Sequence, residues 1–134
     1  MTEDNEKRVR EFYAATMPGH RERLLSLQAP HVLYEMPEGL SAGGGRFEGL
    51  RDVGERFLPS FYGAFDVHFE IDQCIAQGEH VVAIGRIRGR TRDRGAPIDV
   101  PFAHVWTVRD DLLTHLRAFT DTAVLARALA EGSP

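Results

Sequence analysis

The 134 residues of the chain are enough for a single domain with a substantial core, and 43% hydrophobic with 27% charged residues is typical of a globular protein. A formal net charge of −4 argues against a general nucleic-acid-binding protein, so we predict no nucleic-acid partner. The charged first ten residues show no signal-peptide pattern, no apolar run is long enough to cross a membrane, and the single cysteine, Cys74, fits a reducing cytoplasm.

Apolar residues recur at helical spacing in the first part of the chain, until Pro18 and Gly19 stop the pattern. The pattern predicts helices over residues 4–17, 20–28, 50–58 and 122–130, and the third should end near Pro59. Asp121 precedes the last helix, and its carboxylate is expected to cap that helix. The glycine run 43–45 is not followed by Lys-Ser/Thr, so residues 39–45 are interpreted as an ordinary loop and not as a phosphate-binding loop.

Residues 31–37 predict a short strand that ends at proline, and a β-hairpin follows over residues 66–77 and 80–92. A two-residue turn at Gly78-Glu79 would place Arg86 and Arg88 on the face that carries Phe69 and its apolar neighbours. Arginines are rare on an apolar face unless they are paired or contact a ligand. This pair of residues is therefore informative about function.

A second hairpin is predicted over residues 100–109 and 112–121, around Asp110-Asp111. A two-residue turn would pair His104 with Arg117. The turn lacks the usual glycine, so a bulge could slip this register by one residue and reverse the faces. The sequence leaves open whether His104 points inward. The order of helices followed by four consecutive antiparallel strands predicts one α+β domain over residues 1–134.

With the stretches 9–15, 33–37, 47–50, 104–110 and 116–121, this order resembles the SnoaL-like and nuclear-transport-factor-2-like superfamily. The resemblance implies a cone-shaped, curved antiparallel sheet wrapped around N-terminal helices (a cystatin-like α+β barrel), an apolar pocket at the open end, and a homodimer formed through the outer sheet face. The same fold hosts isomerases, cyclases, epoxide hydrolases, dehydratases and proteins without known catalysis, so it does not fix an activity.

The catalytic groups known from relatives are mostly missing. The positions that match a ketosteroid-isomerase-like site hold Phe12, Met36 and Ala103. An epoxide-hydrolase-like site would keep only Arg86. A SnoaL-like cyclase site would keep a histidine at His104 but has Ala118 in place of its acid.

The catalytic candidates are Glu35, Arg86, Arg88 and His104. His104 could act as a general acid or base, because imidazole titrates near neutral pH, or it could be a structural or interface histidine. The arginines could clamp a carboxylate, a phosphate or an enolate, or they could pair with Glu35, Asp99 or Glu70. A Glu35–Arg86 ion pair is the expectation for Glu35, because nearby guanidiniums lower the pKa of a carboxyl group.

The expected pocket wall consists of Phe12, Tyr13, Met36, Phe57, Phe61, Ala103, Leu116 and Ala118. The histidines show no metal-ligand spacing with acids or with Cys74, so we predict neither metal nor cofactor. The resulting hypothesis is a protein that binds a small organic molecule, with cofactor-free acid/base chemistry of the isomerase, cyclase or dehydratase class. The alternative is a non-catalytic ligand-binding or structural dimeric domain.

Overall fold

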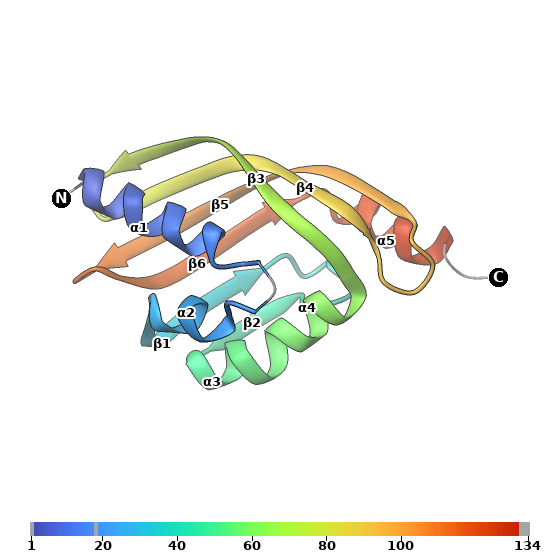
Figure 1. Cartoon of the computed structure of the whole chain (residues 1–134), viewed down its shortest axis with the longest axis horizontal. Helices are drawn as coiled ribbons and strands as arrows, with labels where there is room; N and C mark the ends of the chain where they lie inside the picture. Colours follow the sequence, from blue (N-terminus) through green and yellow to red (C-terminus); the bar gives the residue numbers. More distant parts are fainter. Residues whose placement is uncertain (1, 18, 132–134) are drawn as a thin grey trace.

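A computed structural model describes residues 2–17 and 19–131 and contains one curved six-stranded sheet with helices against it (Figure 1). The strand order across the sheet is β2-β1-β6-β5-β4-β3. The strands are β1 (Gln28–Met36), β2 (Gly45–Glu48), β3 (Phe65–Gln77), β4 (His80–Thr91), β5 (Pro97–Arg109) and β6 (Leu112–Thr120).

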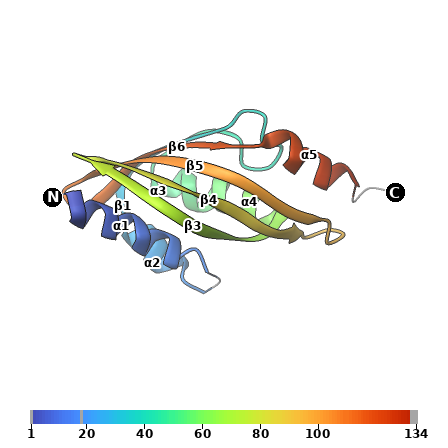
Figure 2. The same cartoon turned by 90° about the horizontal axis from the view of Figure 1, so that it is seen from above.

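Helices α1 and α2 lie beneath the sheet in the second view, whereas α5 follows β6 at the other end of the sheet (Figure 2). The predicted α+β class is confirmed. In the described part of the chain, no helix has the length and hydrophobicity needed to cross a membrane. The helical elements are α1 (Thr2–Ala14), α2 (Arg21–Ser26), α3 (Leu50–Asp52), the π-helical segment η1 (Val53–Phe57), α4 (Leu58–Ala64) and α5 (Thr122–Glu131).

The sheet is mixed, which corrects the prediction of a purely antiparallel sheet. Strand β1 begins at Gln28, earlier than predicted, and runs parallel to β6, with Tyr34 opposite Leu116. Strand β2 is antiparallel to β1 and forms an edge of the sheet. The sequence pattern missed the β1–β6 pairing because it joins segments about 80 residues apart, and no local signal specifies it.

Both hairpins have the predicted two-residue turns, but each contains a one-residue bulge that reverses the faces beyond it. In the first hairpin Ile71 pairs with Gly85 and Gln73 with Ile84, so Asp72 is the extra residue. Gly85 is required at this point, since a Cβ there would lie 1.8 Å from the carbonyl oxygen of Glu70. Beyond the bulge Arg86 pairs with Glu70, so the expectation that it shares a face with Phe69 is wrong.

The second hairpin has its extra residue at Thr114, between the pairs Thr107–His115 and Val108–Leu113. His104 consequently pairs with Ala118 and not with Arg117. Side chains alternate along β5, so His104 faces the helices together with the fully buried Trp106. The question that the sequence left open is therefore settled: His104 points inward.

The third predicted helix does not end at Pro59 but continues to Ala64. The backbone widens to a π-helical turn just before the proline, where the Leu58 N–H donates to the Val53 carbonyl, five residues back. The next donor in that register would be Pro59, which has no N–H. The Gly54 carbonyl accepts instead from the Arg21 guanidinium at 2.7 Å. The helix thus tolerates the proline, and the carbonyl that the proline leaves without a helical partner holds Arg21 in place.

The predicted helix cap at Asp121 is confirmed, because its carboxylate accepts a hydrogen bond of 3.2 Å from the Val124 N–H.

The turn at Asp110 and Asp111 provides a test of the second hairpin. Both residues have positive φ, 52° and 64°, the backbone of a type I′ turn, which side chains other than glycine adopt at a cost. We expect Asp111→Gly to raise the free energy of unfolding in urea by about 0.5–1 kcal/mol. Thr107→Gly, in the extended part of β5, is the control and should lower the unfolding free energy. Destabilisation by Asp111→Gly would contradict the turn assignment.

Candidate functional site

A cavity of about 40 Å³ lies between the helices and the inner face of the sheet, and its wall is almost entirely apolar and aromatic. Helix α1 and the segment η1–α4 supply the aromatic side, and β6 supplies the aliphatic side. Seven of the eight residues predicted to form the pocket wall are found in it: Phe12, Tyr13, Met36, Phe57, Phe61, Leu116 and Ala118.

The eighth predicted wall residue, Ala103, lies on the other face of the sheet. It pairs with Phe119, whereas its neighbour His104 pairs with Ala118 and takes the inward position. The bulge at Thr114 is the reason, because it brings the two inward-facing residues His104 and Ala118 opposite each other. In the predicted register without a bulge, which pairs His104 with Arg117, Ala103 is opposite Ala118.

Three side chains form a buried chain of hydrogen bonds behind the cavity. The indole N–H of Trp106 donates to the Tyr13 hydroxyl at 3.0 Å. The same hydroxyl makes a 2.5 Å hydrogen bond to Nδ1 of His104. These bonds tie α1 to β5, and all three side chains are buried. Buried polar groups are stabilised in this way only when each of them finds a partner.

The hydrogen-bond pattern fixes the tautomer of His104. The Tyr13 hydroxyl makes no other hydrogen bond within the described residues, so its proton is satisfied only if it is donated to Nδ1. Nδ1 is then an acceptor, and the ring proton is on Nε2. Burial lowers the pKa of His104 to about 3, so the imidazole is neutral at pH 7. Burial also raises the pKa of Tyr13 well above its ordinary value, which keeps the phenol protonated.

The Nε2–H of His104 is the group that faces the cavity. Nε2 has no hydrogen-bond partner among the described residues. It is nevertheless not fully buried, because Nε of Arg8 is the one fully buried side-chain nitrogen or oxygen in the described residues that lacks a partner. His104 Nε2 is therefore reached from the cavity that the residue lines. No carboxylate is present in the described wall of this cavity. The arrangement offers a neutral hydrogen-bond donor in apolar surroundings and no strong base.

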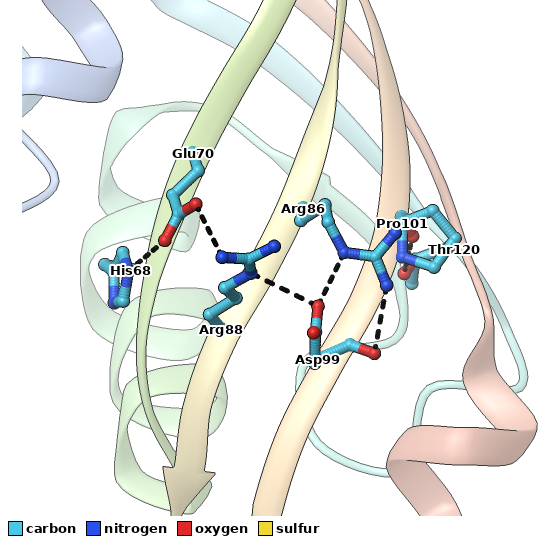
Figure 3. Close-up of polar contacts among 7 residues, drawn as sticks. All are labelled: His68, Glu70, Arg86, Arg88, Asp99, Pro101 and Thr120. Atoms are coloured by element: carbon cyan, nitrogen blue, oxygen red, sulfur yellow. Dashed lines mark hydrogen bonds and ion pairs between the residues drawn. The ribbon is translucent and has the colours of Figure 1, made fainter.

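The structure places Arg86 and Arg88 on the outer face of the sheet, away from the cavity. Figure 3 shows them in a row of alternating charges. Arg86 Nε donates to the Asp99 carboxylate at 2.6 Å, and Arg88 lies 3.3 Å from the same carboxylate and 3.2 Å from Glu70. Arg86 lowers the pKa of Asp99 chiefly through this hydrogen bond. Pairing with Asp99 and Glu70, which was one of the two expectations for these arginines, is confirmed.

Glu35 also lies on the outer face, but its partners there include His115 and Arg117 and not Arg86, so the predicted Glu35–Arg86 ion pair is wrong. Its carboxylate forms a 2.6 Å hydrogen bond with Nε2 of His115, and Arg117 lies 3.8 Å away. The His115 hydrogen bond is the main reason why the pKa of Glu35 is lowered. Of the four catalytic candidates, only His104 lines the cavity, and the other three do not converge on it.

Sequence reasoning missed the partners of His104. Tyr13 is predicted only as a wall residue, and Trp106 is not among the predicted site residues. The hydrogen bonds to the Tyr13 hydroxyl span 91 and 93 positions of the chain, so no spacing in the sequence reveals them. The described residues contain no group of three or more histidine, cysteine or acidic side chains that could hold a metal ion.

Comparisons with known proteins agree with this architecture. A family model described as "SnoaL-like domain" matches residues 9–116. An NTF2-like protein from Burkholderia xenovorans LB400 is 27% identical, with a TM-score of 0.85 over 96% of this chain and 98% of that chain. TerC, co-crystallised with polyporic acid, is 26% identical, with a TM-score of 0.85 over 95% of this chain and 98% of its own.

A candidate SnoaL-like polyketide cyclase from Jannaschia sp. CCS1 shares the fold, with a TM-score of 0.84 at 19% identity over 99% of this chain and 94% of that chain. A search of curated proteins gave no significant match.

The buried neutral histidine predicts a pH dependence of stability. An unfolded histidine binds a proton near pH 6.5, whereas folded His104 does so only near pH 3, so the unfolded state binds more protons in between. Stability therefore falls as the pH falls. Between about pH 6.5 and about pH 5 we expect His104 to account for a loss of roughly 1.5 kcal/mol in urea unfolding.

The His104→Gln variant should lose this part of the pH dependence, because glutamine does not titrate. His20→Gln, an exposed histidine before α2, tests whether loss of any histidine has the same effect. The assignment of a buried, neutral His104 fails if wild type and His104→Gln lose equal free energy over this interval.

Proposed function

The chain belongs to the SnoaL-like domain family, whose fold relatives include candidate polyketide cyclases and isomerases, and from this premise we propose that it binds one small, largely apolar organic molecule in the aromatic cavity. His104 donates its Nε2–H to an acceptor oxygen of that molecule, such as a carbonyl. The observation that carries the proposal is the Nε2–H of His104, a donor without a partner among the described residues on a residue that lines an apolar cavity.

The physical chemistry of the cavity favours such a ligand. Burying the apolar surface of a ligand against these walls stabilises the complex by roughly 25 cal/mol for each Å² removed from water. A hydrogen bond to His104 adds about 0.5–1.5 kcal/mol, and its main effect is to orient the ligand. Because His104 and Tyr13 are both uncharged, the cavity does not by itself attract an ion. TerC, the relative at 26% identity, was crystallised with polyporic acid, which supports a small organic ligand here.

A second candidate function is cofactor-free catalysis of the isomerase, cyclase or dehydratase class, and the position of His104 in the cavity wall favours it. A ligand carbonyl that accepts from Nε2–H would become polarised, while the Tyr13 hydroxyl holds the imidazole in the tautomer that donates. The missing element is a base in the cavity wall. Glu35 is a poor substitute, because it lies on the outer face and its pKa is lowered.

The proposal includes a homodimer through the outer face of the sheet. Neighbouring strands place an apolar band there, in which Ile75 pairs with Val82 and Val82 with Val105. A second row runs from Ile84 through Ala103 to Phe119. Ile75 and Phe119 are 54% and 49% exposed, which is unusual for large apolar side chains unless another surface covers them.

Ligand binding can be tested with acetophenone and ethylbenzene, which differ mainly in the carbonyl oxygen. Trp106 is the chain's one tryptophan and donates to Tyr13, so its fluorescence and its indole NMR signal report on the cavity without further assignment. We expect wild type to bind acetophenone about fivefold more tightly than ethylbenzene. His104→Phe should remove this difference, and Tyr13→Phe, which frees the tautomer, should reduce it.

Circular dichroism of each variant controls for folding. Equal affinity of wild type for the two compounds would contradict the role of His104. Catalysis is tested separately by following exchange of the acetophenone methyl protons in D₂O by NMR. Binding without accelerated exchange supports a ligand-binding protein, and acceleration that His104→Phe abolishes supports the acid/base alternative.

The dimer is tested by light scattering after size-exclusion chromatography. We expect wild type to elute with twice the 15.0 kDa mass of one chain, and Phe119→Glu to elute as a monomer because it places a charge in the apolar band. Met17→Glu is the matched control, since Met17 is 63% exposed but does not belong to that band. A monomeric wild type would rule the dimer out.

A further inference from the structure

A groove of about 850 Å³ adjoins the cavity on the outside of the molecule. Its walls come from the end of α1 and the segment that leads into α2, from α4, and from the adjacent ends of β3 and β4. The groove and the cavity share four wall residues: Thr16, Leu24, Leu58 and Tyr62. A ligand with one end in the cavity would therefore extend into the groove.

The groove carries an excess of positive charge. Its described wall contains three arginines, Arg21, Arg90 and Arg92, and one carboxylate, Asp66. Asp66 lies 3.2 Å from Arg90 and neutralises it. Arg21 and Arg92 make no ion pair with any described residue. A local excess of two positive charges on a protein of net charge −4 attracts an anion specifically to this place.

Backbone carbonyls hold both unpaired guanidiniums in position without neutralising them. Arg21 donates to the Gly54 carbonyl, which has no helical partner because Pro59 lacks an N–H. Arg92 donates through Nε to the carbonyl of Tyr62, in the last turn of α4, where helix carbonyls lack intrahelical partners. Each arginine keeps further N–H groups free for a ligand. The two positive groups are thus pre-organised, one against η1 and the other against the last turn of α4.

We propose that the groove binds the anionic end group of the ligand whose apolar end occupies the cavity, so that the ligand class is an amphipathic organic anion such as an arylalkyl carboxylate. The inference rests on the proposed function, because it assigns the second half of the same ligand. Guanidinium groups suit a carboxylate, since two parallel N–H groups can donate to its two oxygens. Arg21 and Arg92 determine specificity in this assignment.

A second depression beside the cavity does not offer the same chemistry. It has a volume of about 300 Å³ and shares Met36, Pro37, Ala118 and Thr120 with the cavity wall. Its charged residues are Glu35 and Arg117, which lie 3.8 Å apart and carry opposite charges. An anion has no electrostatic preference for that depression.

The test compares phenylbutyrate with its amide, which has the same length but no charge. Dissociation constants are measured through Trp106 fluorescence and calorimetry. We expect wild type to bind phenylbutyrate about tenfold more tightly than the amide, and Arg21→Gln and Arg92→Gln each to weaken phenylbutyrate binding about threefold without affecting the amide. High salt should weaken only phenylbutyrate binding. Arg94→Gln, in the exposed β4–β5 turn, removes the same charge outside the groove and should change neither affinity.

Equal affinity for the acid and the amide, or an equal loss of phenylbutyrate binding in Arg94→Gln and Arg21→Gln, would overturn the assignment. The outcome for acetophenone separates the two proposals. If acetophenone binding depends on His104 but phenylbutyrate is not preferred over its amide, the proposed function stands and the groove is not an anion site. If phenylbutyrate binding depends on the two arginines but acetophenone does not bind, the groove remains an anion site and His104 is not the donor to the ligand. If neither compound binds, both proposals fall.

Discussion

An extra residue in each hairpin, Asp72 in β3 and Thr114 in β6, reverses which side chains of its strand face the helices. The side-chain period of a strand is two, so one inserted residue exchanges inner and outer positions for the rest of the pairing. Without the first bulge Arg86 would oppose an apolar side chain, and without the second His104 would oppose Arg117. The bulges keep the arginines in water and put one histidine inside.

The interior tolerates that histidine because its hydrogen bonds are supplied locally. Trp106 donates to Tyr13 and Tyr13 donates to Nδ1 of His104, so the Nε2–H is the one polar group of these three side chains without a partner among the described residues. The consequence for chemistry is direct. A charged imidazole would demand a counterion, and the described cavity wall contains no carboxylate to provide one. A neutral imidazole with its proton on Nε2 needs a hydrogen-bond acceptor but no counterion. The cavity therefore suits uncharged, mostly apolar groups.

The sequence predicted what depends on local patterns. The α+β class, both two-residue turns, the Asp121 cap and seven of the eight wall residues follow from periodicity, turn position and family resemblance. It failed where the outcome depends on distant pairing. The bulge at Asp72 depends on Gly85 across the hairpin, and the parallel pairing of β1 with β6 has no local signal. For this reason sequence patterns alone predict the outer-face residues Glu35, Arg86 and Arg88 as site residues.

The hydration of guanidinium groups explains how an apolar cavity and a cationic groove can lie side by side. Guanidinium groups inside the cavity would lose hydration that its walls cannot replace. Arg21 and Arg92 avoid this loss because they lie at the surface. Each donates a hydrogen bond to a backbone carbonyl of the η1–α4 segment, which contains Pro59 and ends at Ala64. Tyr62 joins the two regions, since its carbonyl holds Arg92 while its ring lines both hollows. Positive charge is thus placed beside a dry cavity without entering it, an arrangement that favours a ligand with one apolar end and one anionic end.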